Sequence, residues 1–440
     1  MTSQLVVGLL GLAVMVGMIA IRIPIGYAMA AVGMGGILIL SGPAILLSQL
    51  KTLAYGTFSN YDLSVVPLFI LMGHIATKAK LSHGLFRAAN AWFGRLRGGV
   101  AMAAIAACAG FGAVCGSSLA TASTMGKVAL PELRRYNYSP ALATGTLAAG
   151  GVLGILIPPS VVLVVYAVIV EANIVTMFAA ALVPGLIAVV FFMIVIAIYT
   201  WIVPEAGPRG GAVSREELIR ATIGVLPVVV VFGLVIGGIY AGLFTPTPAA
   251  SIGVFLVLLY GAVRRLLGWK DVLDAILETA KTSGMIYLIV LGAELLKIFM
   301  SRGGVPQAAA HMMLTSGLEP YVILILLLVA LIVLGCLMDS LSMIILAMPF
   351  FWPVIAQLDF GMSLTDTKVW FGILALIVVE LGLITPPVGM NVFVINSMAR
   401  DVPMMETFKG AMPFFLIELV RVALLLAFPA IVLFFPAMMG

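Results

Sequence analysis

The chain has 440 residues, of which 63% are hydrophobic and only 9% are charged, and its mean hydropathy is +1.24. About a quarter of the residues of a soluble globular protein are charged, so this composition excludes that class and predicts a membrane protein with many spans. Membrane topology explains the net charge of +5 better than nucleic acid binding does. The three cysteines and three histidines are scattered without metal-ligand spacing, and no catalytic cluster is apparent, so we expect no enzyme.

The first apolar run, residues 4–20, is followed by a further span rather than by a cleavage site. We interpret it as a retained transmembrane helix and not as a signal peptide. The positive-inside rule then assigns most of the 23 basic residues to the cytoplasm and both termini to the outside. The segments assigned to the cytoplasm are Arg22, 78–97, 127–135, 209–220, 264–281 and 400–409.

A re-entrant hairpin is predicted from about residue 98 to about residue 133. This segment is apolar enough to enter the membrane, yet basic residues flank both of its ends, so both ends belong on the cytoplasmic side. Its middle, GFGAVCGSSLATAST (110–124), supplies the small and hydroxyl residues that a re-entrant tip needs. Non-helical backbone at membrane depth is tolerated only beside protein or a water-filled cavity, so we expect this hairpin to line a site.

A helix broken by two prolines is expected next, over about 139–170, and its centre reads LGILIPPSVV (153–162). The segment 203–220 follows as the only convincing linker, and we place it in the cytoplasm. It divides the chain into an N-terminal half, residues 1–202, and a C-terminal half, residues 221–440.

The C-terminal half repeats both features, with a second hairpin over about 322–357 and a second broken helix over about 368–399. The hairpin contains GCLMDSLSMIILAMPFFWP, and the broken helix contains LGLITPPVGM. The spacing from Ser118 to Pro131 equals that from Ser340 to Pro353. Few basic residues flank the second hairpin, so it opens from the opposite side. The sequence therefore predicts an all-α inverted repeat, a common plan of secondary transporters.

Each half also contains an amphipathic segment, 85–97 and 269–281, whose apolar residues share one helical face. We expect both segments to be separate helices that lie in the cytoplasmic interface. The alternative is that they are the polar ends of ordinary spans.

The proline pairs have a physical consequence for the backbone. A proline has no N–H group and crowds the carbonyl four residues earlier. The two pairs therefore free the carbonyl groups of Gly154, Ile155, Gly382 and Leu383. Unpaired carbonyls are costly in hydrocarbon, and Na⁺ takes oxygen ligands, so we predict one ion site in each half with a substrate site between them. Proline pairs that only kink a membrane helix are the alternative.

The hairpin tips supply further oxygen ligands in this prediction. The first tip offers Gly112, Gly116, Ser117 and Ser118, and the second offers Gly335, Asp339 and Ser340. Asp339 is the most informative acid, because a carboxylate inside a membrane hairpin is costly; its alternative role is to bind a hairpin amide or hydroxyl. Glu171 and Glu380 are less specific. The N-terminal ends of the half-helices beyond each break suit the carboxylate of an organic anion. The residues assigned to that anion are Thr121, Ser160, Ser342 and Asn391.

Four motifs together resemble the large membrane subunit of a TRAP (tripartite ATP-independent periplasmic) transporter. They are GILIPPS (154–160), GLITPPVGMN (382–391), GAVCGSSLATASTM (112–125) and MDSLSMIIL (338–346). The resemblance covers essentially the whole chain and is closest to the dicarboxylate and sialic acid type M subunits. By motif, it implies that the first Na⁺ site takes the first hairpin tip with Gly154, Ile157 and Pro159. The second site takes the second tip with Gly382, Thr385 and Val388.

The resemblance also implies partners and a mechanism. A small four-helix membrane subunit (Q type) and a soluble periplasmic substrate-binding protein (P type) are expected to work with this chain in the bacterial inner membrane. We expect the small subunit to be a separate chain. Import of an organic acid such as a dicarboxylate or sialic acid would be driven by Na⁺ as the coupling ion, with no cofactor. The family moves by an elevator mechanism, in which a transport domain holding both hairpins and both broken helices slides against a scaffold domain, as in the ion transporter superfamily.

Three other functions are weighed against this one. A stand-alone Na⁺/dicarboxylate or citrate carrier shares the inverted-hairpin plan but usually has Ser-Asn-Thr at its tips, where this chain has GSSLAT and MDSLSM. An ion channel needs no paired hairpins that close a site from opposite sides. A membrane enzyme is the weakest alternative, because no catalytic constellation occurs at one depth.

Overall fold

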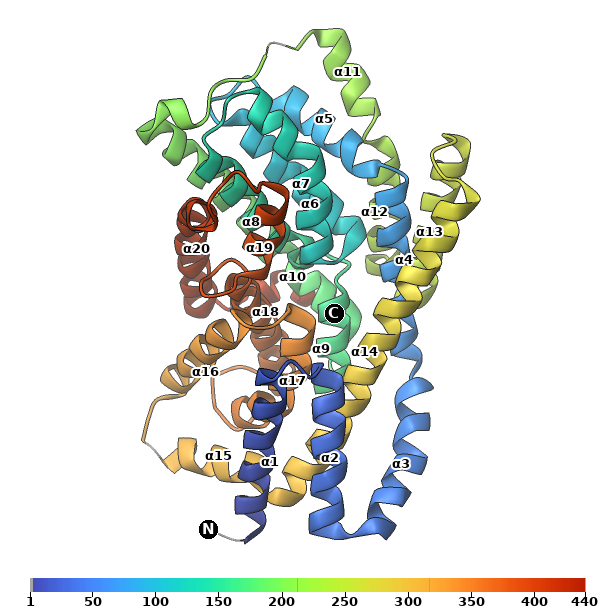
Figure 1. The fold of residues 1–440 in the computed structure, drawn as a ribbon, viewed down its shortest axis with the longest axis vertical. Coiled ribbons are helices and arrows are strands. Elements are labelled where there is room, and N and C mark those ends of the chain that lie inside the picture. The colour runs from blue at the N-terminus through green and yellow to red at the C-terminus, as the bar shows by residue number, and fades with distance from the viewer. Residues whose placement is uncertain (1–2, 212, 316, 440) are drawn as a thin grey trace.

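The computed structural model describes residues 3–211, 213–315 and 317–439. Within these ranges the chain consists of helices and the turns between them, without a strand, so the predicted all-α class is confirmed (Figure 1). Six of the described helices are long and apolar enough to cross a membrane, and the number rises to eight when each of two bent helix pairs is counted as one span. The chain is a multi-pass membrane protein.

One part of the molecule is built on two long helices that pack together, α2 (Ile25–Ser41) and α14 (Trp269–Gly303) (Figure 1). Glycines on α2 let the two backbones approach closely. A Cβ atom at Gly33 would lie 2.7 Å from the carbonyl carbon of Leu295, and small residues at helix interfaces serve this purpose in membranes. The helices packed around this pair are α1 (Ser3–Ala20), α3 (Pro43–Phe58) and α4 (Val65–Lys78).

Two antiparallel helix pairs occupy opposite halves of the molecule, the first above and the second below in Figure 1. Their helices are α6 (Gly99–Cys115), α7 (Ser118–Arg135), α16 (Pro320–Gly335) and α17 (Ser340–Ile355). These bounds lie within two residues of the hairpins expected over 98–133 and 322–357. The first tip is tight because Gly116 adopts a left-handed conformation, with φ of 63°, which glycine tolerates without steric penalty.

Each helix pair is followed by a helix that is interrupted at its proline pair. The segments are α8 (Pro140–Leu156), α9 (Val161–Val170), α18 (Leu364–Gly382) and α19 (Met390–Met398). The direction of the chain bends by 47° between α8 and α9. Both Pro–Pro peptide bonds are cis.

Matching glycine contacts join each hairpin to its own broken helix. A Cβ atom at Gly112 would lie 2.7 Å from the Cα of Gly154, and one at Gly382 would lie 2.6 Å from the Cα of Gly335. Each contact joins a glycine near the end of the first hairpin helix, five residues before Ser117 or four before Asp339, to a glycine four residues before the first proline of the pair. The repeat therefore extends from the sequence to the packing.

The two halves interlock through their broken helices. The hydroxyl of Tyr166 on α9 donates a 2.8 Å hydrogen bond to the carbonyl of Lys368 on α18. A Cβ atom at Gly145 on α8 would lie 2.2 Å from the carbonyl carbon of Gly410, so α8 also packs tightly on a helix of the other half, α20 (Met404–Ala427). The hairpins and broken helices of both halves are thus packed into one body.

The remaining helices complete the bundle. They are α5 (Leu81–Phe93), η1 (Tyr61–Ser64), α10 (Ile174–Ile202), η2 (Pro204–Ala206), α11 (Arg215–Ile223), α12 (Leu226–Tyr240), α13 (Pro246–Val263), α15 (Val305–Thr315) and α21 (Ala430–Met439). Part of the interval 203–220, expected as a linker, is helical: the side chain of Ser214 accepts a hydrogen bond from the backbone N–H of Glu217 and caps α11.

The two amphipathic segments differ in the structure. The segment 85–97 overlaps α5, which is bent by 68° from the preceding helical segment (Tyr61–Lys78). The expected separate helix over 269–281 is wrong, because this segment is the first part of the continuous helix α14. No proline interrupts residues 269–303, so the change from a polar to an apolar surface along α14 does not end the helix.

Contacts between charged residues agree with the cytoplasmic assignment of the basic segments. Lys78 Nζ lies 3.4 Å from Asp274 Oδ2, and Arg134 Nη2 lies 2.5 Å from Asp401 Oδ1. All four residues come from, or directly adjoin, segments that the positive-inside rule assigned to one side. The hydrogen bond from Arg134 lowers the pKa of the exposed Asp401 carboxyl.

Candidate functional site

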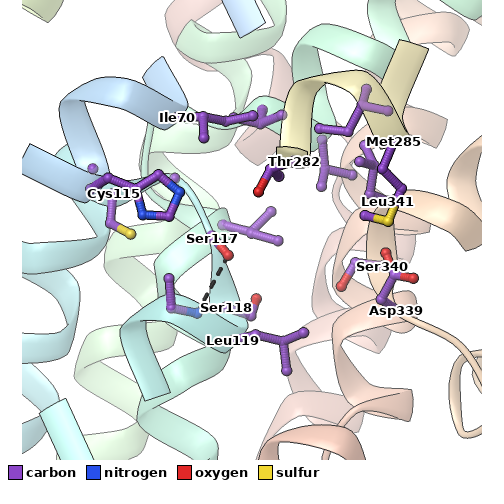
Figure 2. Close-up of a pocket in the computed structure, with 18 of the residues that line it drawn as sticks. Ile70, Cys115, Ser117, Ser118, Leu119, Thr282, Met285, Asp339, Ser340 and Leu341 are labelled. Carbon is purple, nitrogen blue, oxygen red and sulfur yellow. Dashed lines mark hydrogen bonds between the residues drawn. The ribbon is translucent and has the colours of Figure 1, made fainter. Parts of the chain in front are cut away.

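A cavity of about 470 Å³ lies between the two hairpin tips and the helices α4 and α14. Figure 2 shows Ser117, Ser118 and Leu119 of the first tip across this space from Asp339, Ser340 and Leu341 of the second. Ile70 and Thr282 belong to α4 and α14, which form the opposite wall. The cavity is therefore shared between the interlocked body and the helices packed around α2 and α14.

Four helices begin at this cavity. Ser118, Val161, Ser340 and Met390 are the first residues of α7, α9, α17 and α19, and all four line it. The first turn of a helix presents unpaired N–H groups and a partial positive charge. The helix starts therefore favour an anion in the cavity, and His74 and Asp339 are the basic and the acidic side chain among its described lining residues.

The residues that start α7 and α17 have equivalent roles at the two tips. Ser117 Oγ accepts a hydrogen bond from the backbone N–H of Ala120 at 3.4 Å, and Asp339 Oδ2 accepts one from Ser342 at 3.1 Å. Both are N-caps, an arrangement that stabilises a helix by about 1 kcal/mol. The alternative role considered for Asp339, binding a hairpin amide, is the one that its carboxylate fills in this structure.

Glu380 connects the two tips. It lies on α18 and is fully buried, and its Oε2 and Oε1 accept hydrogen bonds from the hydroxyls of Ser118 and Ser340. Sequence reasoning named Glu380 only as a less specific acid. Its signal was its position within an apolar helix, where an ionisable residue is a functional hypothesis by default.

Backbone and side-chain oxygens without hydrogen bonds gather at the first break. The carbonyl groups of Gly154, Ile155, Ile157 and Pro159 accept no hydrogen bond from any residue that the structure describes, as the prolines predict for the first two. Thr121 Oγ1 is also buried and has no partner within the described ranges.

These oxygens lie close together beside the first tip. A Cβ atom at Gly154 would fall 2.4 Å from Thr121 Oγ1 and 2.7 Å from the Ser117 carbonyl oxygen. A Cβ atom at Gly116 would fall 2.8 Å from the carbonyl oxygen of Pro159. The glycines therefore bring the tip and the break into close contact at these oxygens, and such a set of hard oxygen donors fits a cation such as Na⁺.

The second break is closed differently. The Leu383 carbonyl accepts a hydrogen bond from the backbone N–H of Asn391 at 3.0 Å, so the expectation that this carbonyl lacks a donor is wrong. The reason is that the chain turns back after the prolines and brings the first turn of α19 against the end of α18. The Gly382 carbonyl accepts a hydrogen bond from the backbone N–H of Thr385 at 3.2 Å, so the expectation that this carbonyl lacks a donor is also wrong. The hydroxyl of Thr385 donates back to the Leu381 carbonyl at 2.6 Å. Val388 is partly exposed and does not line the cavity.

The residues assigned to an organic anion lie behind the tips. Ser160 caps α9, accepting from Leu163 at 3.3 Å, and Asn391 donates to the Ala148 carbonyl at 3.3 Å. These two, Thr121 and Ser342 are buried, and none of the four lines the cavity. Of the predicted site residues, the cavity brings together Gly116, Ser117, Ser118, Asp339 and Ser340.

Polar side-chain contacts join the two helices of the opposite wall. His74 Nδ1 on α4 lies 3.2 Å from Glu278 Oε2 on α14, one turn from the pair between Lys78 and Asp274. His74 lines the cavity, although in the sequence it is one of three scattered histidines without a recognisable role. Only the packing of α4 on α14 gives it a partner.

Comparison with known proteins agrees with this architecture. Residues 12–431 match the model of the tripartite ATP-independent periplasmic transporter family, DctM component. The C4-dicarboxylate TRAP transporter large permease protein DctM of Pseudomonas aeruginosa is 33% identical over 391 residues, which cover 88% of each chain. The sialic acid TRAP transporter large permease protein SiaM of Vibrio cholerae is 28% identical over 426 residues and 96% of each chain.

The fold also matches a solved structure. The YdaH transporter of Alcanivorax borkumensis, described as having an unusual topology, superposes with a TM-score of 0.64 over 87% of this chain and 88% of that one, at 15% identity. This likeness concerns the fold alone. The match over residues 12–431, together with relatives that are about one-third identical over most of their length, shows that this chain belongs to the DctM family of tripartite ATP-independent periplasmic transporters.

Proposed function

We propose that this chain is the large membrane subunit of a Na⁺-driven TRAP transporter in the bacterial inner membrane, and that it imports a small organic acid anion. A periplasmic binding protein of the P type delivers the anion, and a separate four-helix subunit of the Q type completes the complex. A tripartite family implies two partner components, although one relative, the isethionate permease protein DctMQ of Oleidesulfovibrio alaskensis, is longer than this chain, which covers 64% of it.

The observation that carries the anion proposal is the meeting of four helix N-termini at one cavity. Ser118, Val161, Ser340 and Met390 start α7, α9, α17 and α19 and line that space, and the first turn of each helix carries a partial positive charge. A carboxylate there gains hydrogen bonds and dipole stabilisation without a fixed positive side chain. Relatives named for C4-dicarboxylate and sialic acid support a carboxylate-bearing substrate, while one named for ectoine widens the range of chemistry.

Sodium coupling is supported by the unpaired oxygens at the first break. We assign the first ion to this site, which consists of Gly112, Gly116, Ser117, Ser118, Gly154, Ile157 and Pro159. The free Thr121 hydroxyl adds an oxygen to the same space. We assign the second ion to a site at the other break. A carbonyl there, such as that of Gly382, already accepts one hydrogen bond and has a second lone pair for the ion. The residues of this site are Gly335, Asp339, Ser340, Gly382, Thr385 and Val388.

An elevator movement is supported by the division of the cavity wall. The tips and breaks of both halves belong to one interlocked body, whereas α4 and α14 belong to the helices that pack around α2. A substrate held by the tips can therefore move with that body past the other wall. In this proposal the interlocked body is the transport domain, and α2, α14 and their neighbours are the scaffold domain.

The test is substrate uptake by proteoliposomes that contain the large subunit, its small subunit and the binding protein. Replacing external Na⁺ with choline or K⁺ is expected to abolish uptake. Uptake that survives this replacement refutes sodium coupling. Uptake that persists at full rate without the binding protein favours the alternative, a stand-alone Na⁺/dicarboxylate-type carrier.

A further inference from the structure

Glu380 has a bonding pattern that ligand binding at either break does not explain. One carboxylate oxygen accepts from Ser118, the first residue of α7, and the other accepts from Ser340, the first residue of α17. The two serines are 222 positions apart in the chain and occupy equivalent places in the repeat. A single side chain of the second half is therefore bonded to both hairpin tips.

No fixed positive charge competes for this carboxylate among the described residues. Arg421, the buried arginine of the neighbouring helix α20, pairs with Glu418 and donates to the Pro184 carbonyl at 2.8 Å. The two serine hydroxyls are the hydrogen-bond donors of Glu380 within the described ranges. Each tip is therefore held at its first helical residue by a buried hydrogen bond.

The backbone around Glu380 is also shaped for this contact. Gly335 and Gly382 pack Cα against Cα, which brings the end of α16 onto the end of α18 just beyond Glu380. On the other side, a Cβ atom at Gly151 would lie 3.2 Å from the Ser118 carbonyl oxygen, so the first tip is pressed against α8. Both tips are therefore close-packed at the places where the carboxylate holds them.

We propose that Glu380 is a positioning residue that couples the two hairpin tips, so that a change at one tip is transmitted to the other through its carboxylate. The coupling acts on the first residues of α7 and α17, which are also the walls of the cavity. Its meaning for transport rests on the function proposed above: ion or substrate binding at one tip would order the other and prepare both for movement as one body.

The direct test is hydrogen–deuterium exchange of the purified protein in lipid nanodiscs, followed by mass spectrometry of peptides covering 112–124 and 335–345. Ser118→Ala is expected to raise the amide exchange rate in both peptides by about tenfold, the effect of losing one buried hydrogen bond. The matched control is Ser117→Ala. This change removes the neighbouring cap, which has no bond to Glu380, and is expected to raise exchange in 112–124 only.

Glu380 variants complete the test. Glu380→Ala is expected to raise exchange at both tips, and Glu380→Gln is expected to restore near-native rates, because an amide offers one acceptor and one donor to the two hydroxyls. Peptides from α2 and α14 report whether a variant is folded. If Glu380→Ala fails to fold, Ser340→Ala replaces it and is expected to raise exchange in 112–124.

An unchanged distant tip in both Ser118→Ala and Ser340→Ala overturns the proposal. So does an equal response of the distant tip to Ser117→Ala. These measurements require neither substrate nor sodium, so they remain decisive if uptake proves independent of Na⁺. That result would refute the proposed function alone.

Discussion

Replacing Gly154 with alanine tests the first ion site most directly. The residue is buried at the end of α8, and the new methyl group would lie 2.4 Å from Thr121 Oγ1 and 2.7 Å from the Ser117 carbonyl oxygen. Ordinary contacts of a Cβ atom begin near 3.4 Å. The first tip must therefore withdraw by about 0.7–1.0 Å to reach an ordinary contact distance, and it would carry its oxygen ligands away from those of the break.

The magnitude follows from two opposing effects. Overpacking of this kind costs about 1–3 kcal/mol, and the better helix propensity of alanine offsets up to about 1 kcal/mol of that. If the ion-bound state is destabilised by a net amount of about 1–2 kcal/mol, the half-saturating Na⁺ concentration rises by about five- to thirtyfold. The assay is a Na⁺ titration of uptake in proteoliposomes, with thermal unfolding of the same preparation measured in parallel.

Gly237→Ala is the matched control for this variant. Gly237 lies within α12, and a Cβ atom there would meet nothing within 4 Å, so sodium dependence is expected to stay unchanged. A Gly154→Ala protein with the native sodium titration and the native melting temperature would show that the space between tip and break is not an ion site and is not tightly packed.

Three further predictions concern buried polar groups. Thr121→Val removes a hydroxyl that has no hydrogen-bond partner in the described ranges, so it is expected to weaken Na⁺ dependence without lowering the melting temperature. The control is Thr144→Val, which removes a hydroxyl bonded to the Pro140 carbonyl at 2.7 Å. Equal sodium titrations of the two variants would exclude Thr121 from the site. Asp339→Ala and Ser340→Ala are both expected to weaken Na⁺ dependence, and unchanged titrations in both would remove the second tip from the site. Arg421→Ala leaves the buried Glu418 carboxylate unpaired and is expected to destabilise the protein by about 3–5 kcal/mol, read as a lower melting temperature in detergent. Lys409→Ala, at the exposed pair with Glu406, is expected to leave that temperature unchanged, and equal effects of these two variants would contradict the burial argument.

Much of the helical plan was predictable because its signals are local. Apolar runs, flanking basic residues and proline pairs located both hairpins and both broken helices, and the equal spacing to proline matched Ser118 with Ser340. Their bonds to one carboxylate were not predicted. A proline removes its own N–H whatever surrounds it, so the unpaired carbonyl of Gly154 followed from the sequence.

Predictions that depended on distant partners were less successful. The Leu383 carbonyl receives a donor because Asn391 folds back on it, and no local pattern encodes that turn. The segment 269–281 continues into α14, since amphipathicity describes a helix face and does not say where the helix ends. The four residues expected to hold an anion are buried outside the lining of the cavity, and their role stays a prediction.

The sequence by itself determined that this chain crosses a membrane repeatedly, that its two halves share one plan, and that each half has a helix broken by prolines. These features were predictable because hydropathy, charge and the missing N–H groups of proline act within a few residues. Only the tertiary structure decided that four helix N-termini meet at one cavity, that the first break keeps its free oxygens while the second regains a donor at Leu383, and that Glu380 binds both tips. These features depend on contacts between residues that are far apart in the chain, and close packing of the glycine pairs fixes which of those contacts form.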